Sequence, residues 1–194
     1  AVGGERGTAC EERGHAACCR CCAPLAVLGH HGDAVKRLAF CGDRRWLVSG
    51  GLDNAVVLWD LEKAGGSSVP RTSSTSSGSI IARARQPCGV YALAASRNGS
   101  VVASAGSDKV IRCWDPRERF QMYFKLRGSK AHQDIVKALL IDDEGRVCVS
   151  GGSDGIVKVW DLRMQQHVLS VEAHEDSVWD LAADARSLGQ GLAE

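Results

Sequence analysis

The sequence predicts an all-β protein assembled from repeated four-stranded antiparallel units, and three observations carry this prediction. Short apolar runs of strand length alternate with polar turns along residues 28–182. Glycine is abundant, with 22 residues, whereas aromatic residues make up 5% of the 194, a balance that suits short strands joined by tight turns. One motif also recurs three times, which indicates a structural repeat.

The recurring motif ends in Trp-Asp and carries a serine and an aspartate at fixed distances before the tryptophan. Its three copies are Ser49, Asp53 and Trp59; Ser104, Asp108 and Trp114; and Ser150, Asp154 and Trp160. A histidine precedes a valine by four residues at three places, His31, His132 and His174. The second copy is preceded by RQPCGVYAL and has no such histidine, so we expect its set of polar residues to be incomplete.

Each unit is expected to contain four strands. The first strand is DAVKRLAF, CGVYALAA or DIVKALLI, the second lies at the serine, the third ends at Trp-Asp, and the fourth is SIIARAR, QMYFKL or HVLSVE. The units are placed at 30–61, 88–116 and 131–162, with a partial fourth at 173–182. The Ser-rich stretch 64–79 is expected to be a mobile loop, and 183–194 a tail outside the repeats.

These repeats resemble WD40 repeats, the blades of a β-propeller. The resemblance covers residues 28–182 and implies about three and a half four-stranded antiparallel blades in an incomplete ring. It also implies that the recurring His, Ser, Asp and Trp residues form buried hydrogen-bond networks, because buried polar groups must satisfy one another.

A catalytic alternative arises at GGSDG, residues 151–155, which has the spacing of a hydrolase nucleophile elbow with Ser153 at its centre. A nucleophile elbow needs a strand, a strained turn and then a helix, whereas IVKVW follows here as a further strand. We therefore expect Ser153 to be a turn residue and the protein not to be an enzyme. The rival hypothesis, in which a His-Ser-Asp set hydrolyses a substrate, predicts labelling of Ser150 by a fluorophosphonate probe.

The net charge of +1 gives no general basic surface, so nucleic acid is not indicated as a partner. No apolar run approaches the roughly 20 residues that span a bilayer, and we expect an intracellular protein of the cytoplasm or nucleus without a membrane partner. The sequence shows no phosphate-binding loop or dinucleotide fingerprint, so we expect no cofactor and no small-molecule substrate.

Five of the nine cysteines crowd into residues 10–22, where Cys18 with Cys21 and Cys19 with Cys22 form C-x-x-C pairs. Such pairs can hold zinc, but a second ligand pair a dozen or more residues further on is missing. We therefore expect no metal site and a disordered segment over residues 1–27. The other four cysteines lie singly among strand-like residues, where a reduced thiol acts as a small apolar group.

A candidate partner surface lies at the position after the valine that opens each first strand. This position holds Lys36, Tyr91, Lys137 and Trp179. A core position would not alternate lysine with aromatic residues, whereas cations and aromatic rings are typical interface anchors. The alternative is that the lysine stems lie along apolar surface and the aromatic rings pack locally.

The sequence resembles the WD repeat-containing protein 48 family, also called the ubiquitin-specific-protease-associated factor, through SDKVIRCWDPR, IVKALLIDDEG, VSGGSDGIVKVWDL and AHEDSVWDL. The resemblance implies a non-catalytic subunit that binds the finger region of certain deubiquitinating cysteine proteases and raises their activity. It places the protease contacts on Lys137 and Trp179.

After Ala183 the chain departs from the family, because DARSLGQGLAE has no Trp-Asp strand and lacks the family's further basic contact. The chain is therefore expected to be a fragment of such a protein.

A second hypothesis keeps the WD40 fold and changes the role, to a general scaffold or the substrate receptor of a ubiquitin ligase. Capture of ligase subunits without a deubiquitinase would favour it.

Overall fold

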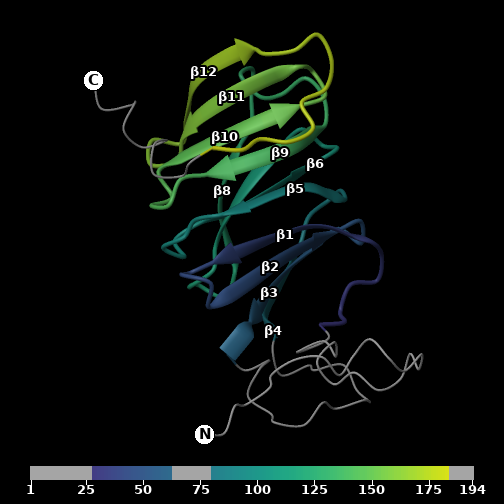
Figure 1. Cartoon of the computed structure of the whole chain (residues 1–194), viewed down its shortest axis with the longest axis vertical. Helices are drawn as coiled ribbons and strands as arrows, with labels where there is room; N and C mark the ends of the chain where they lie inside the picture. The colour runs from purple at the N-terminus through teal and green to yellow at the C-terminus, as the bar shows by residue number, and fades with distance from the viewer. Residues whose placement is uncertain (1–27, 63–79, 184–194) are drawn as a thin grey trace, which may run out of the picture.

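The computed structural model describes residues 28–62 and 80–183, which form three four-stranded antiparallel sheets (Figure 1). In each sheet the strands are hydrogen-bonded in sequence order, as the repeat pattern predicts. The first sheet contains β1 (Val35–Cys41), β2 (Trp46–Gly51), β3 (Ala55–Asp60) and β4 (Ile80–Arg85); the second contains β5 (Val90–Ala95), β6 (Val102–Gly106), β7 (Ile111–Asp115) and β8 (Gln121–Leu126); the third contains β9 (Val136–Ile141), β10 (Val147–Gly152), β11 (Ile156–Asp161) and β12 (Gln166–Glu172).

The three sheets are stacked, with the first strands β1, β5 and β9 side by side (Figure 1). One apolar cluster joins the first two sheets around Val48, Leu58 and Trp114. A second joins the second and third sheets around Ile111, Leu139 and Trp160. Burial of these side chains stabilises the stack by about 25 cal/mol per Å² of apolar surface.

Glycine in the second strand allows neighbouring units to approach closely. A Cβ atom added to Gly50 would lie 2.5 Å from Cγ1 of Val90, which belongs to the next sheet. The same relation recurs in the third sheet, where a Cβ atom on Gly151 would lie 2.5 Å from Cγ1 of Val178. At these two junctions the valine that opens one unit packs on a glycine of the unit before it, whereas the second sheet has Ala105 at the corresponding position.

The predicted fourth unit forms no sheet. Residues 173–183 contain no strand, although Val178 is buried and its amide donates to the Gly152 carbonyl at 2.9 Å. Because Val178 lies on Gly151 as Val90 lies on Gly50, this segment occupies the place of the first strand of a following sheet. It stays irregular because the described part of the chain supplies no second strand with which it could pair.

The turns between the first and second strands of the sheets are linked to one another by backbone hydrogen bonds. The Asp43 amide donates to the Arg97 carbonyl at 2.7 Å, and the Asn98 amide donates to the Asp143 carbonyl at 3.0 Å. The Arg97 side chain adds ion pairs to Asp43 and Asp143, at 3.3 and 3.9 Å. We call this end of the stack the turn end.

Cysteines contribute to the core as reduced thiols. Cys41, Cys113 and Cys148 are buried in strands, and burial raises the pKa of Cys41 to about 11 and that of Cys148 to about 12. Cys88, expected in a strand, instead lies in the loop before β5 and is partly exposed.

Several predictions concern residues outside those that the structure describes: the Cys-rich segment 1–27, the loop 64–79 and nearly all of the tail 183–194. Within the described ranges, no group of three or more His, Cys, Asp or Glu residues is arranged to hold a metal ion. No helix in these ranges is long and apolar enough to cross a membrane.

Candidate functional site

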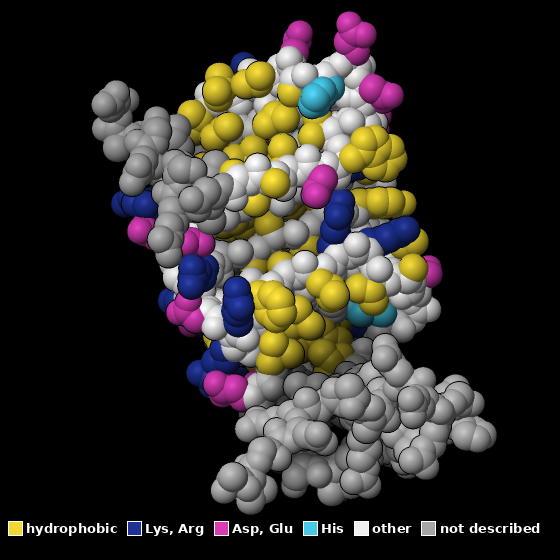
Figure 2. All heavy atoms as spheres, in the orientation of Figure 1, with side chains coloured by type: hydrophobic (Ala, Val, Ile, Leu, Met, Phe, Trp, Pro, Cys, Tyr) yellow, Lys and Arg dark blue, Asp and Glu magenta, His cyan; other side chains and the backbone are white. Residues whose placement is uncertain are grey.

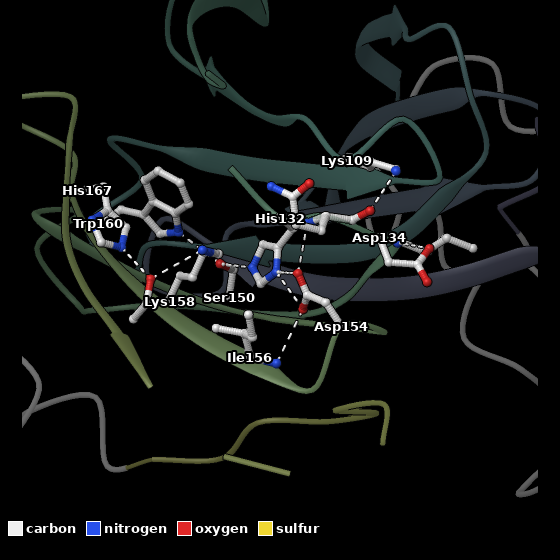
Figure 3. Close-up of polar contacts among 12 residues, drawn as sticks. Lys109, His132, Asp134, Ser150, Asp154, Ile156, Lys158, Trp160 and His167 are labelled. Atoms are coloured by element: carbon white, nitrogen blue, oxygen red, sulfur yellow. Dashed lines mark hydrogen bonds and ion pairs between the residues drawn. The ribbon is translucent and has the colours of Figure 1, made fainter. Parts of the chain in front are cut away.

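The third sheet contains a buried chain of four polar side chains (Figure 3). The Trp160 indole donates to Ser150 Oγ at 2.8 Å, and Ser150 Oγ lies 2.8 Å from His132 Nε2. His132 Nδ1 lies 3.0 Å from both carboxylate oxygens of Asp154, and the Gln133 amide donates to Asp154 at 2.8 Å. A neutral imidazole that donates from Nδ1 and accepts the serine proton at Nε2 satisfies every member of this chain.

The arrangement has the order of a serine-hydrolase triad, but its surroundings are not those of a nucleophile. Ser150 is fully buried, and its oxygen already accepts the Trp160 indole proton. A nucleophilic oxygen must be exposed to its substrate. Ser153 lies in a turn, where its amide donates to the Ile135 carbonyl at 2.8 Å. The polar chain is therefore suited to holding strands together.

The first sheet repeats this arrangement. His31 Nδ1 lies 2.9 Å from Asp53, His31 Nε2 lies 2.7 Å from Ser49 Oγ, and the Trp59 indole donates to the same oxygen at 2.8 Å. Arg83 adds an ion pair to Asp53 at 3.3 Å. Two sheets thus carry the same network at the same positions of the repeat.

The second sheet was expected to have an incomplete network because its histidine is missing. The serine still has partners on both sides, whereas the aspartate pairs elsewhere. Gln86 takes the place of the histidine. Its Oε1 accepts the Ser104 hydroxyl at 2.8 Å, Ser104 Oγ accepts the Trp114 indole at 2.8 Å, and Gln86 Nε2 donates to the Cys88 carbonyl at 3.0 Å. Gln86 is 5% exposed. The signal in the sequence was its spacing, because Gln86 precedes Val90 by four residues, as His132 precedes Val136.

Asp108 of the second sheet does not pair with Gln86 in the way that Asp53 and Asp154 pair with their histidines. It pairs with Arg112, whose Nη1 lies 3.1 Å from Oδ1. Burial acts to raise the pKa of Asp108, but hydrogen bonds from Arg112 and Cys88 and the charge of Arg112 outweigh it and lower the pKa below the usual value. A cation has therefore replaced histidine as the aspartate's partner.

His174 is the one histidine of the predicted set that the structure leaves outside a network. Its side chain is exposed and its backbone amide donates to the Gly155 carbonyl at 3.1 Å. Within residues 28–62 and 80–183 no Ser-Asp-Trp set follows it, which explains why its ring has no such contacts.

The network makes stability depend on pH. Burial lowers the pKa of His132 below its usual value, against the opposing effect of Asp154. Between the usual pKa of about 6.5 and this lowered value, the unfolded chain binds a proton that the folded chain does not. We therefore expect His132 to contribute no pH dependence to the free energy of unfolding above about pH 7, and to lower that free energy on acidification below about pH 6.5.

Asp154 affects the free energy of unfolding at lower pH than His132 does. Burial raises its pKa, but the Gln133 amide and His132 outweigh this and hold the pKa below the usual value, so its contribution is lost below about pH 4. Urea unfolding between pH 4.5 and 7.5 therefore reports on the histidines, with His167, whose pKa burial also lowers, contributing beside His132. A His132→Gln variant should lose this part of the pH dependence, and an unchanged slope in that variant would contradict the assignment to His132.

The predicted partner surface is a set of corresponding residues that we call the docking row: Lys36 on β1, Tyr91 on β5, Lys137 on β9 and Trp179 in the segment after β12. Tyr91 is 36% exposed and Trp179 is 68% exposed. The Lys137 ammonium lies 3.5 Å from the centroid of the Trp179 ring and donates to Ser177 Oγ at 3.2 Å. The row lies at the opposite end of the first strands from the turn end.

A residue that the sequence reasoning missed lies beside the docking row. Arg37 Nε donates to the Tyr91 carbonyl at 3.1 Å, and its Nη2 donates to the carbonyls of Lys137 at 3.1 Å and Trp179 at 3.3 Å. The signal in the sequence was VKRLAF, in which arginine stands where VYALAA and VKALLI have alanine. One side chain thus contacts three members of the row.

Comparison with known proteins places these features in a family. The sequence pattern described as "WD40: WD domain, G-beta repeat" matches residues 22–60, 78–115 and 124–161, together more than half of the chain. Solved structures described as "Structure of U3-55K" and "Crystal structure of RRP9 WD40 repeats" are similar, each with a TM-score of 0.66 and 22% identity. Each match covers 79% of this chain and 43% of the solved chain. At this identity the likeness concerns the fold, and it confirms that the three sheets are propeller blades.

Proposed function

This chain belongs to the WD40 repeat family, and we propose that it is a non-catalytic regulatory subunit whose docking row binds a ubiquitin-specific protease and raises its activity in protein deubiquitination. WD40 repeats form protein-interaction scaffolds, and the resemblance of the sequence motifs to the WD repeat-containing protein 48 family supports this more specific role. That resemblance assigns the protease contacts to Lys137 and Trp179.

The observation that carries the proposal is the exposed Trp179 ring held against the Lys137 ammonium. A large apolar ring that is 68% exposed gains free energy when a partner covers it. Aromatic residues and neighbouring cations are typical of the side chains that dominate binding at interfaces. The row therefore suits a protein surface that offers an apolar contact for Trp179 and carboxylates for Lys36 and Lys137.

Activation would follow from selective binding. A subunit that binds the productive conformation of a protease better than its resting conformation shifts the population toward the productive one, and the rate rises accordingly. No residue of this chain then needs to contact the scissile bond, in agreement with the buried position of Ser150.

The proposal is tested by titrating the full chain into catalytic domains of ubiquitin-specific proteases and measuring hydrolysis of a fluorogenic ubiquitin substrate. We expect a saturable increase in kcat for at least one protease, with half-saturation in the micromolar range or below. A heat-denatured sample of the chain is the control. The absence of binding and activation across the panel, together with capture of ubiquitin-ligase subunits, would contradict the protease role and support the substrate-receptor role.

A further inference from the structure

The side chain of Arg37 connects three successive units of the repeat. Its acceptors are the carbonyl oxygens of Tyr91, Lys137 and Trp179, which lie 54, 100 and 142 residues further along the chain. All three acceptors belong to docking-row residues, and Lys36, the fourth member, is the chain neighbour of Arg37. The guanidinium is therefore hydrogen-bonded to three members of the row, and its own residue follows the fourth directly in the chain.

Arginine is the side chain whose chemistry fits this position. The guanidinium is planar, always charged and offers five donors in a fixed fork, so it can donate to several carbonyl oxygens at once. A lysine ammonium is a compact charge on a flexible stem and cannot keep three separated acceptors in one geometry. The corresponding positions of the second and third sheets hold Ala92 and Ala138, whose methyl groups donate no hydrogen bond.

The contact matters most for Trp179, because the segment that carries it belongs to no sheet. Its neighbour Val178 is held by the Gly152 carbonyl and by packing on Gly151. Trp179 itself is held by the contact of its ring with Lys137 and by the hydrogen bond from Arg37 to its carbonyl. Arg37 thus supplies to this residue the backbone restraint that a sheet supplies to Tyr91 and Lys137.

We infer that Arg37 is a positioning residue that holds Tyr91, Lys137 and Trp179 in one preformed binding surface. The inference rests on the proposed function for the use of that surface, but the positioning itself is a property of the free protein. A surface ordered before its partner arrives loses less conformational entropy on binding, so the complex dissociates more slowly.

The test uses the full chain labelled with 5-fluorotryptophan and observed by fluorine NMR. The five tryptophans give one resonance each, and a Trp179→Phe variant assigns the resonance of Trp179. Trp59, Trp114 and Trp160 are buried in the first, second and third sheets, so their resonances report whether each sheet is folded.

In Arg37→Met and in Arg37→Lys we expect the Trp179 resonance to move at least about half of the way to the value of free 5-fluorotryptophan, while the three buried resonances stay in place. The matched control is Arg97→Met, which removes an arginine that also links three sheets but lies at the turn end. It should leave the Trp179 resonance unchanged. If Arg37→Met also displaces the buried resonances, that variant is no longer correctly folded. The movement of the Trp179 resonance in Arg37→Lys then tests the inference.

An unmoved Trp179 resonance in the folded Arg37→Lys variant, or an equal displacement in Arg97→Met, would overturn the inference. The same variants are then measured for dissociation from the protease catalytic domain found in the activation assay, where we expect about a tenfold faster off-rate for both Arg37 variants. Should no protease bind the unmodified chain, the proposed function fails while the fluorine result still decides the role of Arg37.

Discussion

Trp179→Ala is expected to weaken binding of a ubiquitin-specific protease catalytic domain by at least about 30-fold, equivalent to about 2 kcal/mol or more. The substitution removes the most exposed large ring of the docking row and leaves the Lys137 ammonium without its aromatic contact. Biolayer interferometry with the immobilised chain measures the affinity and the two rate constants. The loss should lie mainly in the off-rate, because truncation of an interface side chain changes contacts rather than long-range steering.

Two controls separate a lost contact from a lost fold. Tyr123 on β8 is 70% exposed and lies away from the docking row, so Tyr123→Ala should leave the affinity unchanged. Unfolding of Trp179→Ala should differ from that of the unmodified chain by no more than about 0.5 kcal/mol, as is usual for surface substitutions. Unchanged affinity in a folded Trp179→Ala variant would remove Trp179 from the partner site.

The second large effect concerns stability, and it is expected for His132→Ala. The substitution leaves the Asp154 carboxylate, whose side chain is 8% exposed, without its imidazole, and it leaves the buried Ser150 hydroxyl without an acceptor. Breaking a buried charge-assisted pair by removing one partner costs about 3–5 kcal/mol. Since a domain is stable by about 5–15 kcal/mol in total, urea unfolding should show a large fall in the midpoint.

His174→Ala is the matched control, because the His174 side chain is exposed and its ring belongs to no network. It should change the free energy of unfolding by less than about 0.5 kcal/mol. Gln86→Ala should have an intermediate effect of about 1–3 kcal/mol, since it leaves the Ser104 hydroxyl without an acceptor but leaves no charged group without a partner, Asp108 being paired with Arg112. Equal effects of His132→Ala and His174→Ala would show that the network does not stabilise the sheets.

The sequence was sufficient to predict the three sheets and the network of the first and third sheets, because both depend on residues that recur at the same spacing. The fourth strands at 80–85, 121–126 and 166–172 were also predicted, from their alternating apolar residues. The docking row followed from the same logic, since one position in a repeat faces the same way in every unit. Its role as a partner surface remains a prediction.

The features that escaped prediction are those in which one unit differs from the others. Gln86 accepts the Ser104 hydroxyl as His31 and His132 do those of their own serines, but the search for histidine alone passed over an amide at the same spacing. Arg37 was overlooked because its acceptors are backbone carbonyls, which carry no sequence signal. The irregular path of residues 173–183 depends on which strands are available for pairing, and that is a property of the assembled sheets.

The two ends of the first strands are fastened in different ways, and this has a mechanical consequence. At the turn end, backbone hydrogen bonds from Asp43 to Arg97 and from Asn98 to Asp143 tie the first three sheets directly together. At the end that carries the docking row, the hydrogen bonds between these sheets come from long cationic side chains, those of Arg37 and of Lys109, whose Nζ donates to the Gln133 carbonyl. Because side chains rearrange more readily than backbone hydrogen bonds, we expect a force applied at the docking row to separate the sheets first at that end, with the turn end acting as the hinge.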